Sequence, residues 1–318
     1  MSELVARVSS NNTPAPPESN PPAQPTLDEG GDDAGDYPQR ADDESALGSV
    51  TWKQYLTPND ERELDRLDLE HNMFLRTFGN RLGTAPPNEE KSNEGRVLDA
   101  GTGTGIWAID FGDEHPDAEV IGVDLLAIWP DYMPMNVRFE IDDLEGPWVF
   151  SQPFNYIHSQ TCRRGLPIRP VTSRSAMIDK VSNLAPGGYL EMNEVDLFPQ
   201  SDDGTIKDDS AILESTRLLH ECSTIFGRSP LKLEDRTKTM TNAHYKEWGA
   251  WCHDDLVARW EGVCMALFTR ALKWPKEEVI VFKADVRKEF VNKQIHPYFS
   301  VWSVYGRKPS TPKSPAVA

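Results

Sequence analysis

The sequence predicts an α/β fold built on a mostly parallel sheet with helices on both faces. From Arg96 onward, short apolar runs typical of strands alternate with segments of helical periodicity, and this alternation is typical of parallel sheets. A glycine-rich turn, "AGTGTG" at residues 100–105, joins the first strand to the first helix. Acidic residues stand at the ends of the first three strands. Ligands of open α/β sheets bind at the carboxyl ends of strands, so these acids predict where a site lies.

The expected strands are short apolar runs bounded by turn residues. They cover residues 96–100, 118–125, 136–144, 154–160 and 188–195. A late run at 296–308 alternates apolar and polar residues, which predicts a strand at a sheet edge or an antiparallel insertion. The expected helices of the body cover residues 105–115, 172–185, 208–226, 254–273 and 275–292.

One more helix precedes the sheet. Six side chains fall on one of its faces at helical spacing: Leu64, Leu67, His71, Phe74, Leu75 and Phe78. Asn59 or Asp60 suits the N-cap of this helix. The residues "GTAPP" follow it and break the periodicity, so a loop separates this helix from the first strand.

Composition divides the chain of 318 residues into a body and two tails. Residues 1–50 hold seven prolines, and ten acidic residues against two basic ones. Such a segment buries too little apolar surface to offset its conformational entropy, so we expect a disordered acidic tail. Residues 51–309 are expected to form a single α/β domain, and residues 310–318 a short C-terminal tail.

Charge and composition narrow the class of protein. A net charge of −18 argues against nucleic acid as a partner, because that partner needs a basic face. No apolar run approaches the roughly 20 residues that span a bilayer, and no signal peptide is recognisable; we expect no membrane partner and a cytoplasmic or nuclear protein. The scattered cysteines predict reduced thiols and no metal site: they are Cys162, Cys222, Cys252 and Cys264.

The glycine-rich turn carries the strongest chemical signal. Its glycines are Gly101, Gly103 and Gly105. A dinucleotide-binding turn of the form GxGxxG needs a third small residue where this chain has Ile106. A P-loop needs a lysine directly after its last glycine, and Ile106 stands there too. The register of the turn therefore excludes a dinucleotide and a nucleoside triphosphate.

The remaining pattern, DxGxGxG after a strand, suits a nucleoside ligand without phosphate. Asp99 places a carboxylate beside the turn, where it repels a pyrophosphate and favours an ammonium or a sulfonium; S-adenosylmethionine carries both. Asp124 ends the second strand, where a carboxylate accepts hydrogen bonds from two ribose hydroxyls. Asp142 or Asp143, at the end of the third strand, is the candidate for the adenine amino group.

Each of these features also has a purely structural interpretation. A glycine-rich turn by itself is often only a tight turn, and an aspartate at a strand end is often a helix cap or a solvated turn residue. The combination favours the cofactor interpretation, because three acids stand at three successive strand ends and the glycine-rich turn follows the first of them.

Most of residues 52–309 resemble class I methyltransferases, and more narrowly the LaeA-like family of fungal methyltransferases. The matching segments include "YLTPNDERELDRLDLEHNMFL", "RVLDAGTGTGIWAIDFGDEHPDAEVIGVDLLAIWP" and "APGGYLEMNEVD", and residues 97–130 are the most specific. The resemblance implies a Rossmann-like sheet with S-adenosylmethionine as methyl donor. It also implies a place in fungal secondary metabolism, either as a tailoring enzyme or as a nuclear regulator of gene clusters.

The chain departs from the family pattern in three places. Asn155 stands where the family usually has aspartate. Three arginines follow the fourth strand, as a solvated loop or as contacts for an acidic group of the substrate: Arg163, Arg164 and Arg169. Residues 229–251 are too polar and too short for the family's apolar strand. We therefore hypothesise that the sheet lacks its usual sixth strand and that residues 298–306 form an exposed edge.

Methyl transfer needs a nucleophile in line behind the sulfonium methyl group, so positioning and desolvation carry much of the catalysis. A hydroxyl or carboxylic acid acceptor also calls for a base. The candidates at the ends of the fourth and fifth strands are His158, Glu191 and Glu194. Histidine suits this role because imidazole titrates near neutral pH, although a histidine in a strand is commonly a packed one. Tyr55 is a candidate lid over the cofactor by resemblance, with packing against the next helix as the alternative.

Two classes of function stay open. One is an enzyme that methylates an oxygen, nitrogen or carboxylate of a small metabolite. The other is a nuclear regulator that works in a protein complex. The acidic tail fits both, as a solubility segment or as an arm for a protein partner. A third class, a fold that has lost its chemistry, is opposed by the intact aspartates and glycines of the turn.

Overall fold

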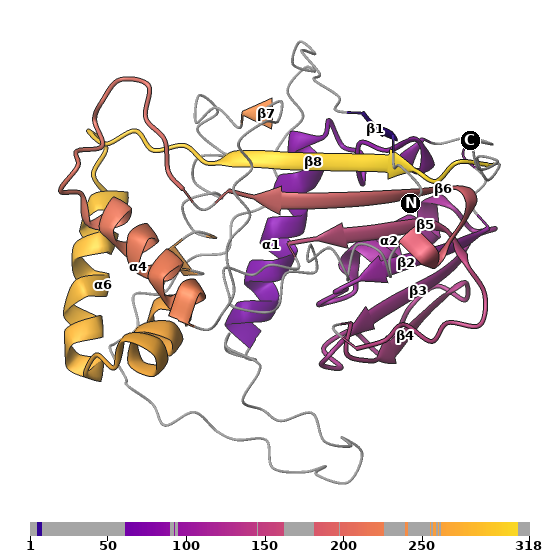
Figure 1. The fold of residues 1–318 in the computed structure, drawn as a ribbon, viewed down its shortest axis with the longest axis horizontal. Helices are drawn as coiled ribbons and strands as arrows, with labels where there is room; N and C mark the ends of the chain where they lie inside the picture. Colours follow the sequence, from indigo (N-terminus) through magenta and orange to yellow (C-terminus); the bar gives the residue numbers. More distant parts are fainter. Residues whose placement is uncertain are drawn as a thin grey trace, which may run out of the picture. The chain divides into compact units, whose positions relative to one another are not determined.

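The structure is a computed structural model that describes residues 5–7, 61–89, 92, 95–144, 146–161, 181–196, 198–225, 239–240, 255, 257–258, 260 and 262–310 (Figure 1). These residues belong to one unit of the chain. Several predictions fall outside them and stay predictions: those on the acidic tail beyond β1 (Val5–Arg7), on Tyr55, and on Arg163, Arg164 and Arg169.

Six strands form the body of a mixed sheet. In chain order they are β2 (Arg96–Ala100), β3 (Glu119–Asp124), β4 (Val137–Ile141), β5 (Phe154–Gln160), β6 (Leu184–Val195) and β8 (Ser300–Arg307). They lie side by side in the order β4-β3-β2-β5-β6-β8, and only the β6–β8 pair is antiparallel. The strand order reverses between β2 and β5, which is the switch point where such sheets bind ligands. The prediction of an α/β, Rossmann-like sheet is confirmed.

The outer edge of β8 carries two short strands. β1 pairs with residues 305–307, and β7 (Thr239–Met240) pairs with residues 300–301, both antiparallel. The polar segment 229–251 therefore does supply a strand beside β8, but one of only two residues. The prediction of an exposed β8 edge is wrong at both ends of the strand, because even short extended segments can satisfy the backbone groups of an edge.

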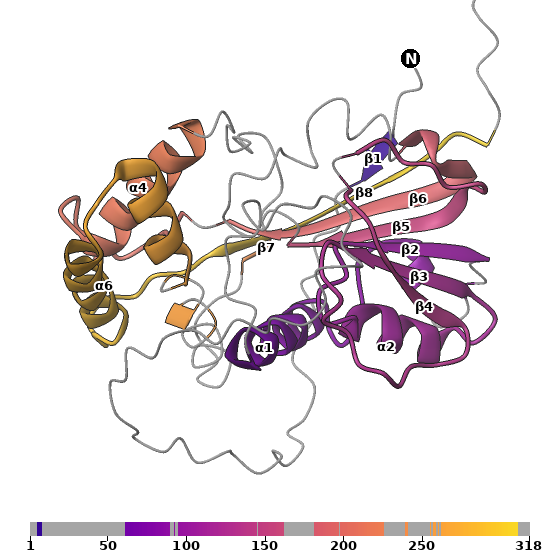
Figure 2. The same cartoon turned by 90° about the horizontal axis from the view of Figure 1, so that it is seen from below.

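Successive strand residues point to opposite faces of the sheet and form two apolar cores. One core joins the sheet to α2 (Ile106–Glu114) and includes Val97, Trp107, Phe111, Val120 and Tyr156. The other core includes Leu98, Ile121, Phe154, Ile157 and Leu190. Figure 2 shows α2 and α1 (Glu61–Thr77) on the same face of the sheet.

Buried ion pairs hold α1 in place. Arg66 is 5% exposed and lies 2.8 Å from Glu63, 2.8 Å from Glu70 and 2.6 Å from Asp255. Burial opposes the charge of Arg66, but the carboxylates outweigh it and raise the pKa of the guanidinium above its usual value. Because Asp255 belongs to a helical segment 189 residues farther along the chain, this cluster ties α1 to that segment.

A separate helical layer comprises α4 (Ala211–Ile225), the π-helical turn η2 (Phe268–Leu272) and α6 (Lys276–Phe290) (Figure 1). Its apolar core consists of Ile212, Leu219, Cys222, Trp260, Val263, Cys264, Leu267, Phe268, Val279 and Val286. The helices predicted at 208–226 and 275–292 are confirmed as α4 and α6. The helix predicted at 254–273 ends in η2, and Lys273 closes that turn with a left-handed φ of 61°.

The described residues give three further results. Cys222 is a buried free thiol, and burial raises its pKa to about 11. Within the described part of the chain, no helix combines the length and apolar character that a membrane span requires. Among the same residues, no group of three or more His, Cys, Asp or Glu side chains is arranged to hold a metal ion.

Candidate functional site

The glycine-rich turn between β2 and α2 forms the base of the candidate site. Gly101, Gly103 and Gly105 have φ values of 80°, 57° and 80°, in the left-handed region that favours glycine. The backbone N–H groups of Gly101 and Thr102 donate to the carbonyl oxygen of Val123 at 2.8 and 3.0 Å. These bonds fix the turn to the end of β3.

Two aspartates accept hydrogen bonds from residues of the turn. Asp99 Oδ2 accepts a hydrogen bond from Thr102 Oγ1 at 2.7 Å. Asp124 Oδ2 accepts from the backbone N–H of Gly103 at 2.9 Å, and its Oδ1 accepts from the N–H of Leu125 at 2.7 Å. Both aspartates are buried. The structure thus brings Asp99 and Asp124 to the turn, where the sequence predicts them.

A cavity lies between this turn and α1, at the carboxyl ends of the strands. Its walls are formed by Leu67, Glu70, His71, Asp99, Gly101, Thr102, Gly103, Thr104, Ile106, Trp107, Gln160 and Thr161. Thr104 Oγ1 donates to Asp68 Oδ1 at 2.7 Å, which holds α1 to the rim of the turn. Three predicted cofactor residues therefore line the cavity: Asp99, Gly101 and Gly103.

The other four predicted cofactor residues lie off the cavity wall. A Cβ at Gly105 would lie 2.5 Å from Cζ of Phe139, so close packing as well as conformation requires glycine there. Asp124 lies beneath the turn. The N–H of Asp142 donates to the carbonyl oxygen of Asp124 at 3.1 Å, which places Asp142 and Asp143 beside the end of β3. Asp142 is exposed and Asp143 half-buried, and their contact with adenine stays a prediction.

His158, the predicted base, is completely buried in β5. Its Nδ1 lies 2.9 Å from Asp99 Oδ1, and its Nε2 lies 3.3 Å from Asn193 Nδ2. Its ring stacks on Trp107 with centroids 3.7 Å apart. The carboxylate accepts and the amide donates, so the neutral imidazole with a proton on Nδ1 satisfies both contacts. Both ring nitrogens are thus engaged, and His158 supports Asp99 without reaching the cavity wall.

Glu191, the second candidate base, is completely buried and accepts six hydrogen bonds. The donors belong to Thr84, Ala85, Asn88, Tyr156 and Ser303, around the short helix η1 (Pro86–Asn88). Burial, followed by this carboxylate, raises the pKa of the Tyr156 hydroxyl well above its usual value. Glu191 therefore anchors the loop after α1 to β6. Glu194, the third candidate, lies opposite Trp302 in the β6–β8 pair and off the cavity wall.

Among the polar residues of the cavity wall that the sequence did not predict as site residues are His71 and Gln160. His71 is 3% exposed, and its Nε2 lies 2.9 Å from Asp110 Oδ2 of α2. Among the described residues, nothing forms a hydrogen bond with His71 Nδ1 or with the buried Oε1 of Gln160. The available signal was a histidine on the otherwise apolar face of the helix predicted before the sheet.

The chemistry of the cavity fits S-adenosylmethionine. The unsatisfied buried atoms of its wall, His71 Nδ1 and Gln160 Oε1, are acceptors, and Glu70 and Asp99 add carboxylates. The described lining residues include no lysine or arginine, which a phosphate would favour. A ligand with positive charge and N–H donors suits such a wall, and the ammonium and sulfonium groups of S-adenosylmethionine have these properties.

Parts of this chain are similar to a family model and to solved structures. Residues 69–225 match a family model described as a methyltransferase domain. Among solved structures, an S-adenosylmethionine-dependent methyltransferase from Thiobacillus denitrificans in complex with S-adenosyl-L-homocysteine gives a TM-score of 0.38 at 14% identity, over 73% of this chain and 97% of that one.

Curated relatives define the family. The chain is 34% identical over 281 residues to the methyltransferase pytC of Aspergillus terreus, covering 80% of this chain and 83% of the relative. It is 31% identical over 282 residues to the secondary metabolism regulator LAE1 of Cochliobolus heterostrophus (80% and 90%). It is 32% identical over 286 residues to the protein-methionine methyltransferase laeA of Emericella nidulans (80% and 72%). The chain belongs to the LaeA-like family of methyltransferases, and it is an S-adenosylmethionine-dependent enzyme.

Proposed function

We propose that this chain methylates an oxygen, nitrogen or carboxylate of a small molecule during the biosynthesis of a fungal secondary metabolite. The observation that carries the proposal is the cavity between α1 and the glycine-rich turn, at the carboxyl ends of β2 and β5. Its wall offers carboxylates and unsatisfied acceptors to a cationic ligand. The 34% sequence identity with the methyltransferase pytC supports methyl transfer as the reaction.

The residues of the glycine-rich turn and of the neighbouring strand ends bind different parts of S-adenosylmethionine. The turn and Asp99 hold the amino-acid end of S-adenosylmethionine. Asp124 binds the ribose hydroxyls through the lone pairs that Gly103 and Leu125 leave available. Asp142 and Asp143, beside the end of β3, approach the adenine.

S-adenosylmethionine supplies an electrophilic methyl group when it is bound. The chain then has to place the acceptor atom in line with that group and exclude water. His158 contributes as a positioning residue: it orients Asp99 through Nδ1, while Trp107 and Asn193 hold its ring. Because both ring nitrogens of His158 form hydrogen bonds within the protein, neither is available to take a proton from the substrate.

Calorimetric titration with S-adenosylmethionine tests the cofactor site. We expect the wild type to bind, and Asp124→Ala to bind about 10- to 100-fold more weakly, because a charge-assisted hydrogen bond contributes roughly 1.5–3 kcal/mol. His296→Ala, in an exposed loop, is the matched control and should bind like the wild type. No binding by the wild type would overturn the assignment, and equal binding by Asp124→Ala would remove this residue from the site.

Transfer of a labelled methyl group tests the acceptor class. The enzyme, S-adenosylmethionine labelled in its methyl group, and a fungal extract divided into low-molecular-weight and protein fractions are incubated together. We expect label in the low-molecular-weight fraction. Label confined to the protein fraction would contradict a small-molecule acceptor.

A second candidate function is regulation through a protein complex, and the 31% identity with the regulator LAE1 favours it. In that case the acidic tail is the arm for a protein partner and the site of action is the nucleus. Deleting residues 11–50 spares β1 and separates the two functions. Loss of partner binding with unchanged S-adenosylmethionine binding would favour the regulator, and unchanged methylation of small molecules would favour the enzyme.

A further inference from the structure

The two ring nitrogens of His71 have different surroundings. Nε2 lies 2.9 Å from Asp110 Oδ2, and a carboxylate only accepts hydrogen bonds, so Nε2 carries the proton. In the neutral imidazole, Nδ1 then keeps its lone pair and can accept a hydrogen bond. It is buried, and no donor among the described residues reaches it. A buried acceptor without a donor is unfavourable, so its place on a cavity wall points to a donor on the ligand.

Gln160 presents a second unsatisfied acceptor to the same cavity. It is the last residue of β5, and its Oε1 is buried without a hydrogen-bond partner in the described part of the chain. His71 comes from α1, so two elements far apart in the sequence each contribute an acceptor. One group that donates to both would satisfy them together, and an ammonium, with three N–H donors, has this capacity.

The charges around the two acceptors also favour a cation. Glu70 and Asp99 line the cavity, and Asp68 and Asp110 flank His71 on α1 and α2. Arg66 on the same helix does not line the cavity; it pairs with Glu70, Glu63 and Asp255, and this cluster of one cation and three carboxylates keeps a net negative charge.

We propose that His71 Nδ1 and Gln160 Oε1 bind the α-ammonium group of the methionine moiety of S-adenosylmethionine. This inference rests on the proposed function and assigns two residues to it. Asp110 is then a positioning residue, because it fixes the tautomer that leaves Nδ1 free to accept. His158 cannot take this part, since both of its ring nitrogens are engaged within the protein.

The test compares S-adenosyl-L-homocysteine with its deamino analogue, in which hydrogen replaces the α-amino group. Binding of both ligands is measured by calorimetry for the wild type and for His71→Gln. Glutamine keeps an N–H that can reach Asp110 but has no acceptor at the position of Nδ1. We expect S-adenosyl-L-homocysteine to bind His71→Gln about 10- to 100-fold more weakly. We expect the deamino analogue to bind both proteins within about threefold.

Two further variants sharpen the test. His71→Asn places an amide oxygen near the position of Nδ1, so it should recover part of the lost affinity. Gln160→Leu removes the second acceptor without altering α1, so it should show the same ligand selectivity even if substitutions at His71 disturb folding. Circular dichroism and thermal unfolding of each variant serve as folding controls.

Specific results would overturn the proposal. One is wild-type affinity of His71→Gln and Gln160→Leu for S-adenosyl-L-homocysteine. Another is an equal loss for both ligands, which would mean that α1 has merely shifted. A third is equal binding of the two ligands by the wild type. Failure of the wild type to bind either ligand would overturn the cofactor site as a whole, so that failure is distinguishable from the others.

Discussion

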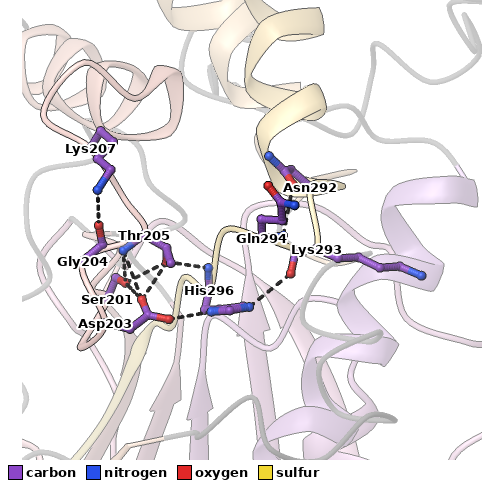
Figure 3. Close-up of polar contacts among 9 residues, drawn as sticks. All are labelled: Ser201, Asp203, Gly204, Thr205, Lys207, Asn292, Lys293, Gln294 and His296. Carbon is purple, nitrogen blue, oxygen red and sulfur yellow. Dashed lines mark hydrogen bonds and ion pairs between the residues drawn. The ribbon is translucent and has the colours of Figure 1, made fainter.

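The buried pair His158–Asp99 and the exposed pair His296–Asp203 join the same two kinds of side chain in opposite surroundings. His158 has one acceptor and one donor beside its ring, which fits a neutral imidazole. His296 Nδ1 lies 2.6 Å from Asp203 Oδ2, and its Nε2 lies 3.1 Å from the carbonyl oxygen of Lys293 (Figure 3). Both partners of His296 are acceptors, so its ring carries two N–H groups and a positive charge.

The loop around Asp203 strengthens the exposed pair. Asp203 Oδ1 accepts from Ser201 Oγ at 2.6 Å, and from Thr205 Oγ1 and N at 2.7 and 3.1 Å (Figure 3). The hydrogen bond from His296, followed by those from Ser201 and Thr205, lowers the pKa of Asp203. The same pairing with Asp203 raises the pKa of His296. Solvent screening keeps the stabilisation by such an exposed pair small.

Burial decides what each of these His–Asp pairs does. The buried pair positions the glycine-rich turn, because His158 orients the Asp99 carboxylate that accepts a hydrogen bond from Thr102. The exposed pair fixes a surface loop and responds to pH. His71–Asp110 is a third case: the histidine is buried, as in the first pair, but only one of its ring nitrogens forms a hydrogen bond within the described part of the protein.

Removing the buried ring should have the largest effect on stability. His158→Ala loses the stacking on Trp107, leaves a cavity in the core and takes a hydrogen bond from Asp99. We expect the free energy of unfolding to fall by about 3 kcal/mol. Urea denaturation measures it. A loss below about 0.5 kcal/mol would show that the buried pair is no more important than an exposed one.

Glu191→Gln should have an intermediate effect. Glutamine keeps the shape of the side chain, but its amide N–H group would face donors such as the N–H of Ala85 and the hydroxyl of Tyr156. We expect a loss of about 2 kcal/mol, because buried donors are left unsatisfied. The same denaturation experiment measures it. Unchanged stability would refute Glu191 as the anchor of the loop after α1.

His296→Ala should have the smallest effect, and one that depends on pH. The raised pKa of His296 gives stabilisation that is complete below its unfolded value of about 6.5 and is lost as pH rises through the folded value. The lowered pKa of Asp203 gives stabilisation that is present above about pH 3.9 and is lost as pH falls through its folded value. The variant should therefore differ from the wild type most between about pH 4 and 6.5.

Melting temperatures recorded across the pH range check this prediction. The difference between His296→Ala and the wild type should shrink towards alkaline pH, where the wild-type imidazolium loses its proton. A difference that grows above pH 8 would contradict the charged pair seen in the structure.

Much of the sheet was predictable because local patterns determine it. β5 occupies the predicted residues 154–160, since an apolar run with flanking turn signals leaves little choice. β6 begins at Leu184, four residues before the predicted start at 188. "APGG" resembles a turn, and Gly187 does have a φ of 85°, but pairing with Phe154 extends the strand across a register irregularity. Tertiary pairing there overrides the local signal.

The site was predictable only where its partners are close in the sequence. The turn lies beside Asp99 and follows from a compact motif. The partners of Glu191 are far from it in the sequence: Tyr156 is 35 residues away, Thr84 is 107 and Ser303 is 112. No local sequence pattern encodes their convergence. The partners of His158, Asp99 and Asn193, are also distant in the sequence. The sequence therefore favoured His158 as a base, although these contacts engage both of its ring nitrogens.

The helical layer of α4, η2 and α6 has an apolar core that shares no described residue with the two cores of the sheet. A substitution in one core therefore leaves the packing of the others largely unchanged, and the Arg66–Asp255 ion pair is one link across the boundary. During evolution, substitutions can therefore accumulate in this helical layer and alter its helices while the geometry of the glycine-rich turn stays constant.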